Sequence, residues 1–171
     1  MAEIRALPLL CLVACATATG SAPRPGSSSG LADFELSDTD GNSVRLSDYL
    51  GKQVVFLDFW ASWCGPCQLE LPQLEALYEK YKGQGFVVLG VAMDDPTTVG
   101  AVAPVARKDG LTFPVLLDSQ SRAVALYNGN KSAPYGVLID RQGRIVEQRA
   151  GYTPGDERAL EAQLVTELAK H

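Results

Sequence analysis

The feature that most limits the fold of this chain is an apolar run that leads directly into a pair of closely spaced cysteines. Residues 54–60 are apolar except for Asp58, which is typical of a strand buried on both faces of a sheet. Cys64 and Cys67 follow, and apolar residues then recur at helical spacing as far as Tyr81. The cysteine pair is therefore expected at the start of a helix that follows a buried strand.

Strand and helix patterns alternate along the rest of the chain. The other expected elements are a β-hairpin of residues 34–36 and 43–46, a helical turn capped by Ser47, a buried strand at 86–93, a helix at 97–108 that Pro104 should interrupt, a strand at 115–117, a helix at 121–127, strands at 135–140 and 145–149, and a closing helix at 154–169 with Pro154 in its first turn. This order predicts an α/β domain with a largely parallel sheet, to which the last two strands add an antiparallel edge.

Size and charge exclude several other classes of protein. A chain of 171 residues with 46% apolar and 20% charged residues suits one soluble domain. The net charge of −5 argues against nucleic acid as a partner, because phosphate-binding surfaces need clustered Lys and Arg. No apolar stretch reaches the length of about 20 residues that a membrane-spanning helix needs.

The N-terminus has the pattern of an export signal. Residues 6–14 form a short apolar segment that suits a signal-peptide core, and the run Leu12-Val13-Ala14-Cys15 resembles the lipobox of bacterial lipoproteins. That resemblance implies a signal peptide over 1–14 and a lipidated Cys15. Residues 15–30 would then be the lipidated cysteine and a flexible tether, with the folded domain at 31–171. The alternative is an uncleaved hydrophobic start with incidental cysteines.

The pair Cys64 and Cys67 is best interpreted as a redox couple. The helix N-terminus carries unpaired N–H groups and a partial positive charge, which would stabilise a thiolate on Cys64, the expected nucleophile. Cys67, about one turn further along, would be the resolving thiol, and Pro66 fits the first turn. The alternative is half of a zinc site, but the chain offers only His171 and no further cysteine in the domain. No metal and no cofactor is therefore expected.

Several segments resemble one family. Residues 56–67 look like the active-site strand and helix start of thioredoxins, and residues 68–72 and 113–118 resemble the membrane-tethered TlpA/ResA branch. Residues 131–140 match the cis-proline segment of that family. The resemblance covers residue 31 to the C-terminus. It implies a thioredoxin-like fold, with a central mixed sheet flanked by helices, an N-terminal β-hairpin and a helical insertion after the second core strand.

The same resemblance implies roles for further residues. Trp63, Gly65 and Pro66 would contact substrate, and a cis bond before Pro134 would expose the Ala133 backbone to an incoming peptide. Ala133 is smaller than the Thr or Val common in the family, and an ordinary trans proline is the alternative. The tryptophan at position 60 is assigned to the core.

Two acids stand near the cysteines. Asp58 lies in an apolar strand, so its pKa should be raised, and it could take the proton that Cys67 must lose. Glu70, three residues past Cys67 on nearly the same helix face, could share that role or shape the groove. The alternatives are a structural, hydrogen-bonded Asp58 and a solvated Glu70. Asp94 and Asp95 are expected to form a turn and a helix cap rather than a metal site.

These observations predict an exported, lipid-anchored thiol–disulfide oxidoreductase that faces the periplasm or outer surface of a bacterium. By resemblance, its partners would be disulfide-containing exported proteins, with apocytochrome c as one possible class, and a DsbD/CcdA-like membrane reductant donor. The protein is expected to be monomeric. The alternatives are a thiol peroxidase and a non-catalytic tethered peptide-binding or chaperone module.

Overall fold

The strand that precedes the cysteines lies at the centre of a five-stranded sheet within the described part of the chain. The computed structural model describes residue 1 and residues 30–170. The sheet has the order β5-β4-β3-β6-β7, and its strands are β3 (Val54–Trp60), β4 (Phe86–Ala92), β5 (Val115–Leu117), β6 (Tyr135–Ile139) and β7 (Ile145–Ala150). A separate hairpin pairs β1 (Glu35–Ser37) with β2 (Ser43–Arg45).

The sheet is mixed, as expected. Strands β3, β4 and β5 run parallel, whereas β6 pairs antiparallel with both β3 and β7. The central strand β3 therefore has a parallel neighbour on one side and an antiparallel neighbour on the other. Every residue of β3 and β4 is buried, which explains why both strands read as near-continuous apolar runs.

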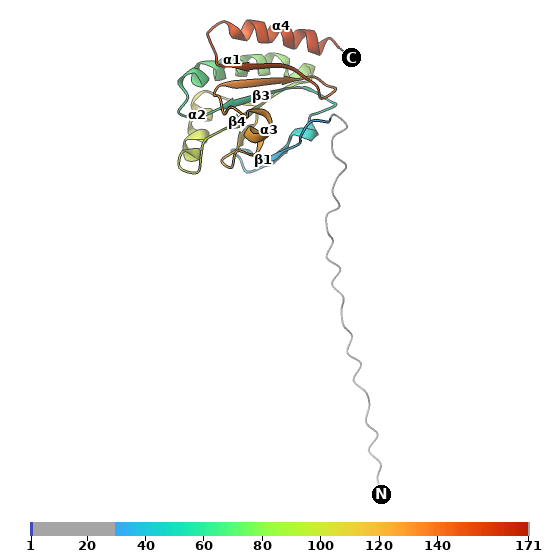
Figure 1. The fold of residues 1–171 in the computed structure, drawn as a ribbon, viewed down its shortest axis with the longest axis vertical. Helices are drawn as coiled ribbons and strands as arrows, with labels where there is room; N and C mark the ends of the chain where they lie inside the picture. Colours follow the sequence, from blue (N-terminus) through green and yellow to red (C-terminus); the bar gives the residue numbers. More distant parts are fainter. Residues whose placement is uncertain (2–29, 171) are drawn as a thin grey trace.

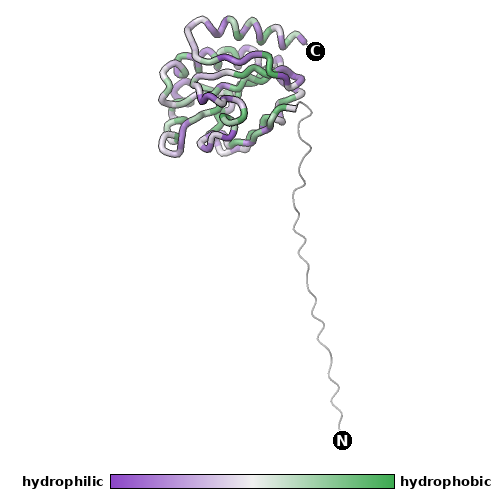
Figure 2. The backbone as a smooth tube through the Cα atoms, viewed as in Figure 1, coloured by the Kyte–Doolittle hydropathy of each residue, from purple (hydrophilic) through white to green (hydrophobic). Residues whose placement is uncertain are grey.

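Helices cover the sheet on both faces (Figure 1). The helices are α1 (Gly65–Tyr81), α2 (Val102–Lys108), α3 (Arg122–Tyr127) and α4 (Asp156–Leu168), with 3-10 turns at Leu46–Asp48, Lys82–Gln84 and Val99–Ala101. Alternate β3 residues, including Phe56 and Trp60, pack in one core cluster with α1, α2 and α4. The other β3 residues, Leu57 and Phe59 among them, pack with the hairpin and α3. Figure 2 shows hydrophobic residues gathered along the central strands.

Three local expectations were wrong. Pro104 lies in the first turn of α2, where a missing N–H costs little, and the change from 3-10 to α geometry falls earlier, between Ala101 and Val102. Helix α4 begins at Asp156, so Pro154 precedes it, and Gly155 in the left-handed region is its N-cap. The turn after β2 begins at Leu46 and has no side-chain cap, while the Ser47 N–H donates to Asp33 instead.

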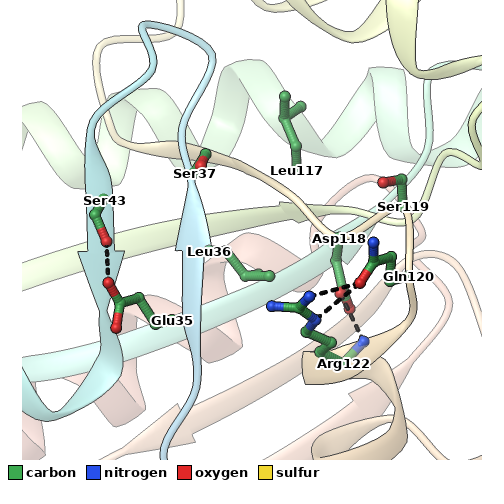
Figure 3. A pocket seen from close by; sticks show the side chains of 9 residues that line it. All are labelled: Glu35, Leu36, Ser37, Ser43, Leu117, Asp118, Ser119, Gln120 and Arg122. Carbon is green, nitrogen blue, oxygen red and sulfur yellow. Dashed lines mark hydrogen bonds between the residues drawn. The ribbon is translucent and has the colours of Figure 1, made fainter.

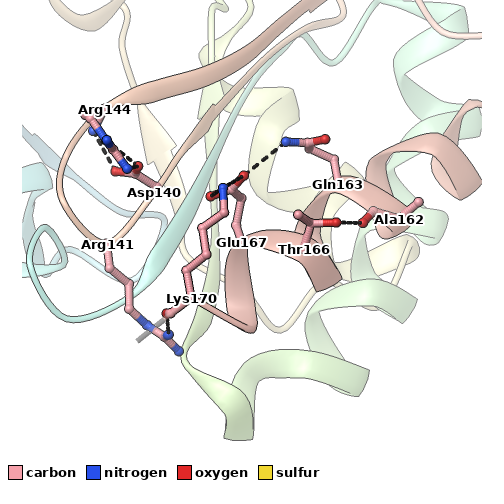
Figure 4. Close-up of polar contacts among 8 residues, drawn as sticks. All are labelled: Asp140, Arg141, Arg144, Ala162, Gln163, Thr166, Glu167 and Lys170. Carbon is pink, nitrogen blue, oxygen red and sulfur yellow. Dashed lines mark hydrogen bonds and ion pairs between the residues drawn. The ribbon is translucent and has the colours of Figure 1, made fainter.

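Helix α4 is fixed to the domain at its middle and at its C-terminal end. Glu161 accepts hydrogen bonds from Lys80 Nζ at 2.6 Å and from the Tyr81 hydroxyl at 2.7 Å, both on α1. Arg141, in the turn between β6 and β7, donates to the carbonyl of Lys170 at 2.9 Å (Figure 4) and to the carbonyl of Leu168 at 3.2 Å. These contacts hold α4 against the same sheet face as α1.

The predicted signal, lipidated Cys15 and tether lie outside the described residues, apart from Met1 and Gly30. Within the part of the chain that is described, no helix is long and apolar enough to cross a membrane.

Candidate active site

The cysteine pair sits where the sequence predicts, between β3 and α1. Cys64 is the N-cap of α1, and its Sγ accepts a hydrogen bond from the Cys67 N–H at 3.2 Å. The two sulfurs form a disulfide, with Cα atoms 5.3 Å apart. Cys64 is 5% exposed and Cys67 1%, so the first sulfur is nearer to solvent. This arrangement places the more accessible sulfur against the helix N–H groups that stabilise a thiolate.

Residues outside the motif hold the loop that carries Cys64. Asp94, fully buried after β4, accepts hydrogen bonds from the Ser62 N–H at 2.9 Å and the Ser62 hydroxyl at 2.5 Å. Gln68 Nε2 donates to the Ser62 carbonyl at 2.8 Å. Asp95 behaves as expected and caps the following turn through the N–H groups of Thr97 and Thr98. The expected turn role of Asp94 was therefore wrong, because β4 ends beside β3 and brings its carboxylate to the cysteine loop.

The cis-proline segment lies against the same site. The Ala133–Pro134 peptide bond is cis, in agreement with the expectation, and Ala133 packs against the cluster that contains both cysteines. Asn128 fixes the segment: its Nδ2 donates to the Ser132 carbonyl at 2.7 Å, and its Oδ1 accepts from the Ser132 N–H at 3.0 Å. Sequence reasoning missed Asn128, a residue that is 1% exposed at the end of α3.

An apolar surface surrounds the cysteines. Trp63 is 65% exposed, and Gly65 and Pro66 are exposed as well, whereas Trp60 is fully buried in the core as expected. Leu69, one turn into α1, is 60% exposed and was not singled out by the sequence. These exposed groups flank Cys64 in sequence and can cover apolar parts of an incoming peptide.

Asp58 is buried in the middle of β3. The carboxyl is 1% exposed, and its Oδ1 has no hydrogen-bond partner among the described residues. Burial raises the pKa of Asp58 well above its usual value, the nearby charge of Glu70 raises it further, and Arg149 opposes the rise. Asp58 is thus a carboxyl that holds its proton to higher pH than an exposed aspartate does.

Glu70 is also buried, at 2% exposure, which contradicts the alternative of a solvated helix residue. Its Oε1 accepts a hydrogen bond from Arg149 Nη2 at 2.7 Å, whereas its Oε2 has no partner among the described residues. Burial raises the pKa of Glu70 to about 7, although Arg149 acts in the opposite direction and Asp156 adds to the rise. Glu70 therefore titrates near neutral pH, in the range that suits a proton acceptor.

Arg149 and Gly136 complete this group, and the sequence pointed to neither. Gly136 pairs with Asp58 on one side and with Arg149 on the other. A Cβ at Gly136 would overlap the Phe56 ring and lie 3.2 Å from Arg149 Nε, so a side chain has no room there. The available signal was a glycine inside a strand, which often marks a close approach. We call Asp58, Glu70 and Arg149 the carboxyl pocket.

A cavity of about 480 Å³ lies apart from the cysteines, between the β1–β2 hairpin and the segment after β5 (Figure 3). Asp118 in its wall accepts from the N–H groups of Arg122 at 2.7 Å and Val124 at 2.9 Å and so caps α3. The Asp118 carboxylate therefore stabilises the start of α3. No group of three or more metal-ligating side chains occurs among the described residues.

The sequence is similar to one protein family and to several named thiol-disulfide oxidoreductases. The model of the AhpC/TSA family matches residues 29–148. Thiol-disulfide oxidoreductase ResA of Geobacillus kaustophilus is 42% identical over 132 residues, covering 76% of this chain and 74% of that protein. ResA of Geobacillus thermodenitrificans is 42% identical over 113 residues, covering 66% of this chain and 63% of that protein. The match thus spans about two thirds to three quarters of the length of these relatives.

Solved structures show the same likeness. A Chlorobium tepidum protein described as a DsbE thiol:disulfide interchange protein superposes with a TM-score of 0.74 at 40% identity, covering 81% of this chain and 94% of that one. StoA of Bacillus subtilis superposes with a TM-score of 0.64 at 25% identity, covering 77% of this chain and 95% of that one. The fold expected from the sequence, a thioredoxin-like arrangement with a mixed sheet, is confirmed.

Proposed function

The chain belongs to the AhpC/TSA family and, within it, to the ResA-like thiol–disulfide oxidoreductases, and from that membership we propose that it reduces disulfide bonds in exported proteins. The observation that supports this most directly is the Cys64–Cys67 disulfide at the N-terminus of α1, next to the Ala133–Pro134 segment. A first cysteine that is slightly more exposed than the second suits a dithiol reductase, in which the first sulfur meets the substrate and the second resolves the mixed disulfide.

The cycle begins with the reduced protein. The Cys64 thiolate attacks one sulfur of a substrate disulfide, which breaks that bond, forms a mixed disulfide and releases the other substrate sulfur as a thiolate. Cys67 then loses its proton and attacks Cys64 Sγ. The mixed disulfide breaks, the second substrate thiolate leaves, and the Cys64–Cys67 disulfide forms. Two electrons thus pass from the dithiol to the substrate.

The two acids differ in their readiness to accept the proton of Cys67. Burial raises the pKa of Asp58 well above its usual value, so this carboxyl holds its proton more tightly than an exposed aspartate does. The pKa of Glu70 is about 7, so part of the population is ionised. Glu70 lies one helical turn beyond Cys67, on nearly the same face. We assign proton acceptance to Glu70, whose ionised form is stabilised by the hydrogen bond from Arg149, and the retained proton to Asp58, whose Oδ1 has no hydrogen-bond partner among the described residues.

The exposed apolar groups suit an unfolded or flexible substrate. Trp63, Pro66 and Leu69 offer contact surface, and Gly65 gives the substrate backbone room near Cys64. The backbone of Ala133 would pair with the substrate by strand addition. Apocytochrome c before haem attachment is one substrate of this kind.

The compartment follows from the N-terminal pattern. Lipidation of Cys15 would tether the domain outside the cytoplasm, at the periplasmic or outer face of a bacterial membrane, through residues 16–30. Because that compartment is oxidising, the disulfide must be reduced again by a DsbD/CcdA-like membrane donor. The working form is expected to be a monomer.

Insulin-disulfide reduction tests the proposal. Wild-type protein supplied with dithiothreitol should accelerate insulin precipitation, Cys64→Ser should abolish the acceleration, and Cys67→Ser should accumulate a mixed disulfide through Cys64. Retention of full activity by Cys64→Ser would refute the nucleophile and favour a non-catalytic chaperone. Turnover of hydrogen peroxide in place of insulin reduction would favour the thiol peroxidase.

Single-turnover kinetics test the division between the acids. Glu70→Gln should slow the attack of Cys67 on the mixed disulfide by about tenfold or more, within the range for loss of a general base, and leave the first attack by Cys64 unchanged. Asp58→Asn should slow the same second step by a smaller factor, because the amide also keeps the site neutral. A larger effect at Asp58 than at Glu70 would reverse the assignment, and no change of either step in the Asp58→Asn protein would remove Asp58 from the mechanism.

A further inference from the structure

We propose that Arg149 is a positioning residue of the reductive cycle, which holds Glu70 in its ionised form as the acceptor for the Cys67 proton and leaves the remaining proton of the carboxyl pocket on Asp58. This inference rests on the proposed reductase function and adds to it a residue from a distant strand.

The sheet register places Arg149 in the site. Asp58 on β3 pairs directly with Gly136 on β6, and Gly136 pairs directly with Arg149 on β7. Directly paired residues of antiparallel strands project to the same face, so Asp58 and Arg149 face the helix α1 that carries Glu70. Because Gly136 has no side chain, the Arg149 side chain can lie over the strand between them.

The guanidinium of Arg149 is held in one place. Its Nη2 donates to Glu70 Oε1 at 2.7 Å, and its Cζ lies 5.1 Å from the centre of the Phe56 ring. Its Nη1 donates to the Asp156 carbonyl at 3.5 Å, at the start of α4. The side chain is only 16% exposed. Arg149 is therefore a fixed, mostly buried charge aimed at one carboxyl.

The charges in the carboxyl pocket indicate which of the two acids keeps a proton. Arg149 forms an ion pair with Glu70 and acts on Asp58 through its charge alone, so the pocket of one cation and two carboxyls is neutral when it holds one proton. The direct hydrogen bond favours the ionised form of Glu70, whereas Asp58 has no such bond from Arg149. The other charged or titratable groups acting on Glu70 are Asp156 and Tyr152, from the segment that leads into α4. Neither of these supplies a positive charge.

Removal of Arg149 should therefore move the pH dependence of the second step. Without the guanidinium, burial and the charge of Asp156 act on Glu70 unopposed, its pKa rises, and less of the acceptor is ionised at pH 7. In Arg149→Met, we expect the midpoint of the rate–pH profile for attack by Cys67 to move to higher pH by about one unit. A rise of one unit lowers the ionised fraction of Glu70 at pH 7 from about one half to about one tenth, so the rate at pH 7 should fall roughly fivefold. The first attack by Cys64 should be unaffected.

The chain offers a matched control. Arg144 on the β6–β7 turn forms an ion pair at 2.7 Å with Asp140, a carboxylate that is 1% exposed and lies at the other end of β6 from Gly136 (Figure 4). Arg144→Met removes the same functional group from a buried Asp on the same hairpin, and it should leave the pH profile at its wild-type position. Arg149→Lys keeps a charge without the guanidinium fork and should move the midpoint upward by less than Arg149→Met does.

The outcomes separate the two proposals. If wild-type protein fails to reduce insulin, the proposed function fails, whatever Arg149 does. If wild type is active and both Arg149 variants keep the wild-type profile, the role of Arg149 is refuted. If Arg149→Met does not fold, the Arg149→Lys profile decides: an upward shift supports the proposal, and an unchanged midpoint overturns it. An equal shift in Arg144→Met would show a general loss of stability and also overturn it.

Discussion

The burial of Glu70 makes the stability of the oxidised protein depend on pH in a specific direction. The pKa of Glu70 rises from 4.5 to about 7 on folding, so the folded state binds this proton more tightly than the unfolded state. The resulting stabilisation is fully present below pH 4.5 and is lost as the pH rises through about 7. The size of this pKa change corresponds to roughly 3 kcal/mol, and Asp58, whose pKa is also raised, acts in the same direction.

The assay is chemical denaturation of the disulfide-intact protein at several pH values between 5 and 8. Glu70 should contribute about 2.5 kcal/mol to the fall in the free energy of unfolding of wild type across this range, in addition to the part that comes from Asp58, and Glu70→Gln should remove the contribution of Glu70. Glu161→Gln is the control. Lys80 and Tyr81 lower the pKa of Glu161, so its contribution is present above pH 4.5 and is lost only at lower pH.

The test compares the loss of unfolding free energy between pH 5 and 8 in wild type with the loss in each variant. An equal loss of unfolding free energy in wild type and Glu70→Gln between pH 5 and 8 would show that Glu70 is not the buried titrating group. The same flattening in Glu161→Gln would show that the effect comes from the overall charge of the protein rather than from the carboxyl pocket.

Three further predictions concern other parts of the chain. Gly136→Ala should lower the free energy of unfolding by about 1–3 kcal/mol in urea titrations, because its Cβ overlaps the Phe56 ring, and an unchanged midpoint would contradict this packing. Asn128→Ala should raise the KM for insulin more than it lowers kcat, because the Ser132 backbone loses both side-chain hydrogen bonds, and an unchanged KM would refute the clamp. Cys15→Ala should abolish processing and membrane retention in cell fractionation, and an unchanged membrane fraction would exclude lipidation.

Most of the fold follows from patterns within single segments. The apolar run of β3 predicts a buried strand over Val54–Trp60, and the structure gives the same bounds. The prolines were harder to interpret, because their effect depends on where a helix begins. Pro104 falls in the first turn of α2, and Pro154 falls before α4, so neither interrupts a helix. Those starting points are decided by packing against the sheet, which no local pattern records.

The functional site likewise contains some residues that a sequence motif identifies and others that only the fold brings together. The two cysteines and Glu70 lie within seven residues of one another, and a motif of that length can be recognised directly. Asp94 and Arg149 are distant in sequence and reach the site through strand order and register. In the sequence, Arg149 lies in a strand with many polar residues and resembles an ordinary surface arginine. Only the strand register, in which Gly136 pairs with both Asp58 and Arg149, shows that Arg149 faces the buried acids.

The mixed order of the sheet explains why an arginine stands at position 149. Strands lie about 4.8 Å apart, so the two strand spacings from β3 across β6 to β7 separate the backbone of Arg149 from that of Asp58 by roughly 10 Å. A side chain that serves Glu70 from that position must be long and must pass over β6, where glycine at 136 is the residue that leaves space. The guanidinium also stacks on Phe56, which a compact ammonium does less well. An ionised Glu70 in this buried site is balanced by a cation, and the topology places that cation on β7 rather than beside the cysteines.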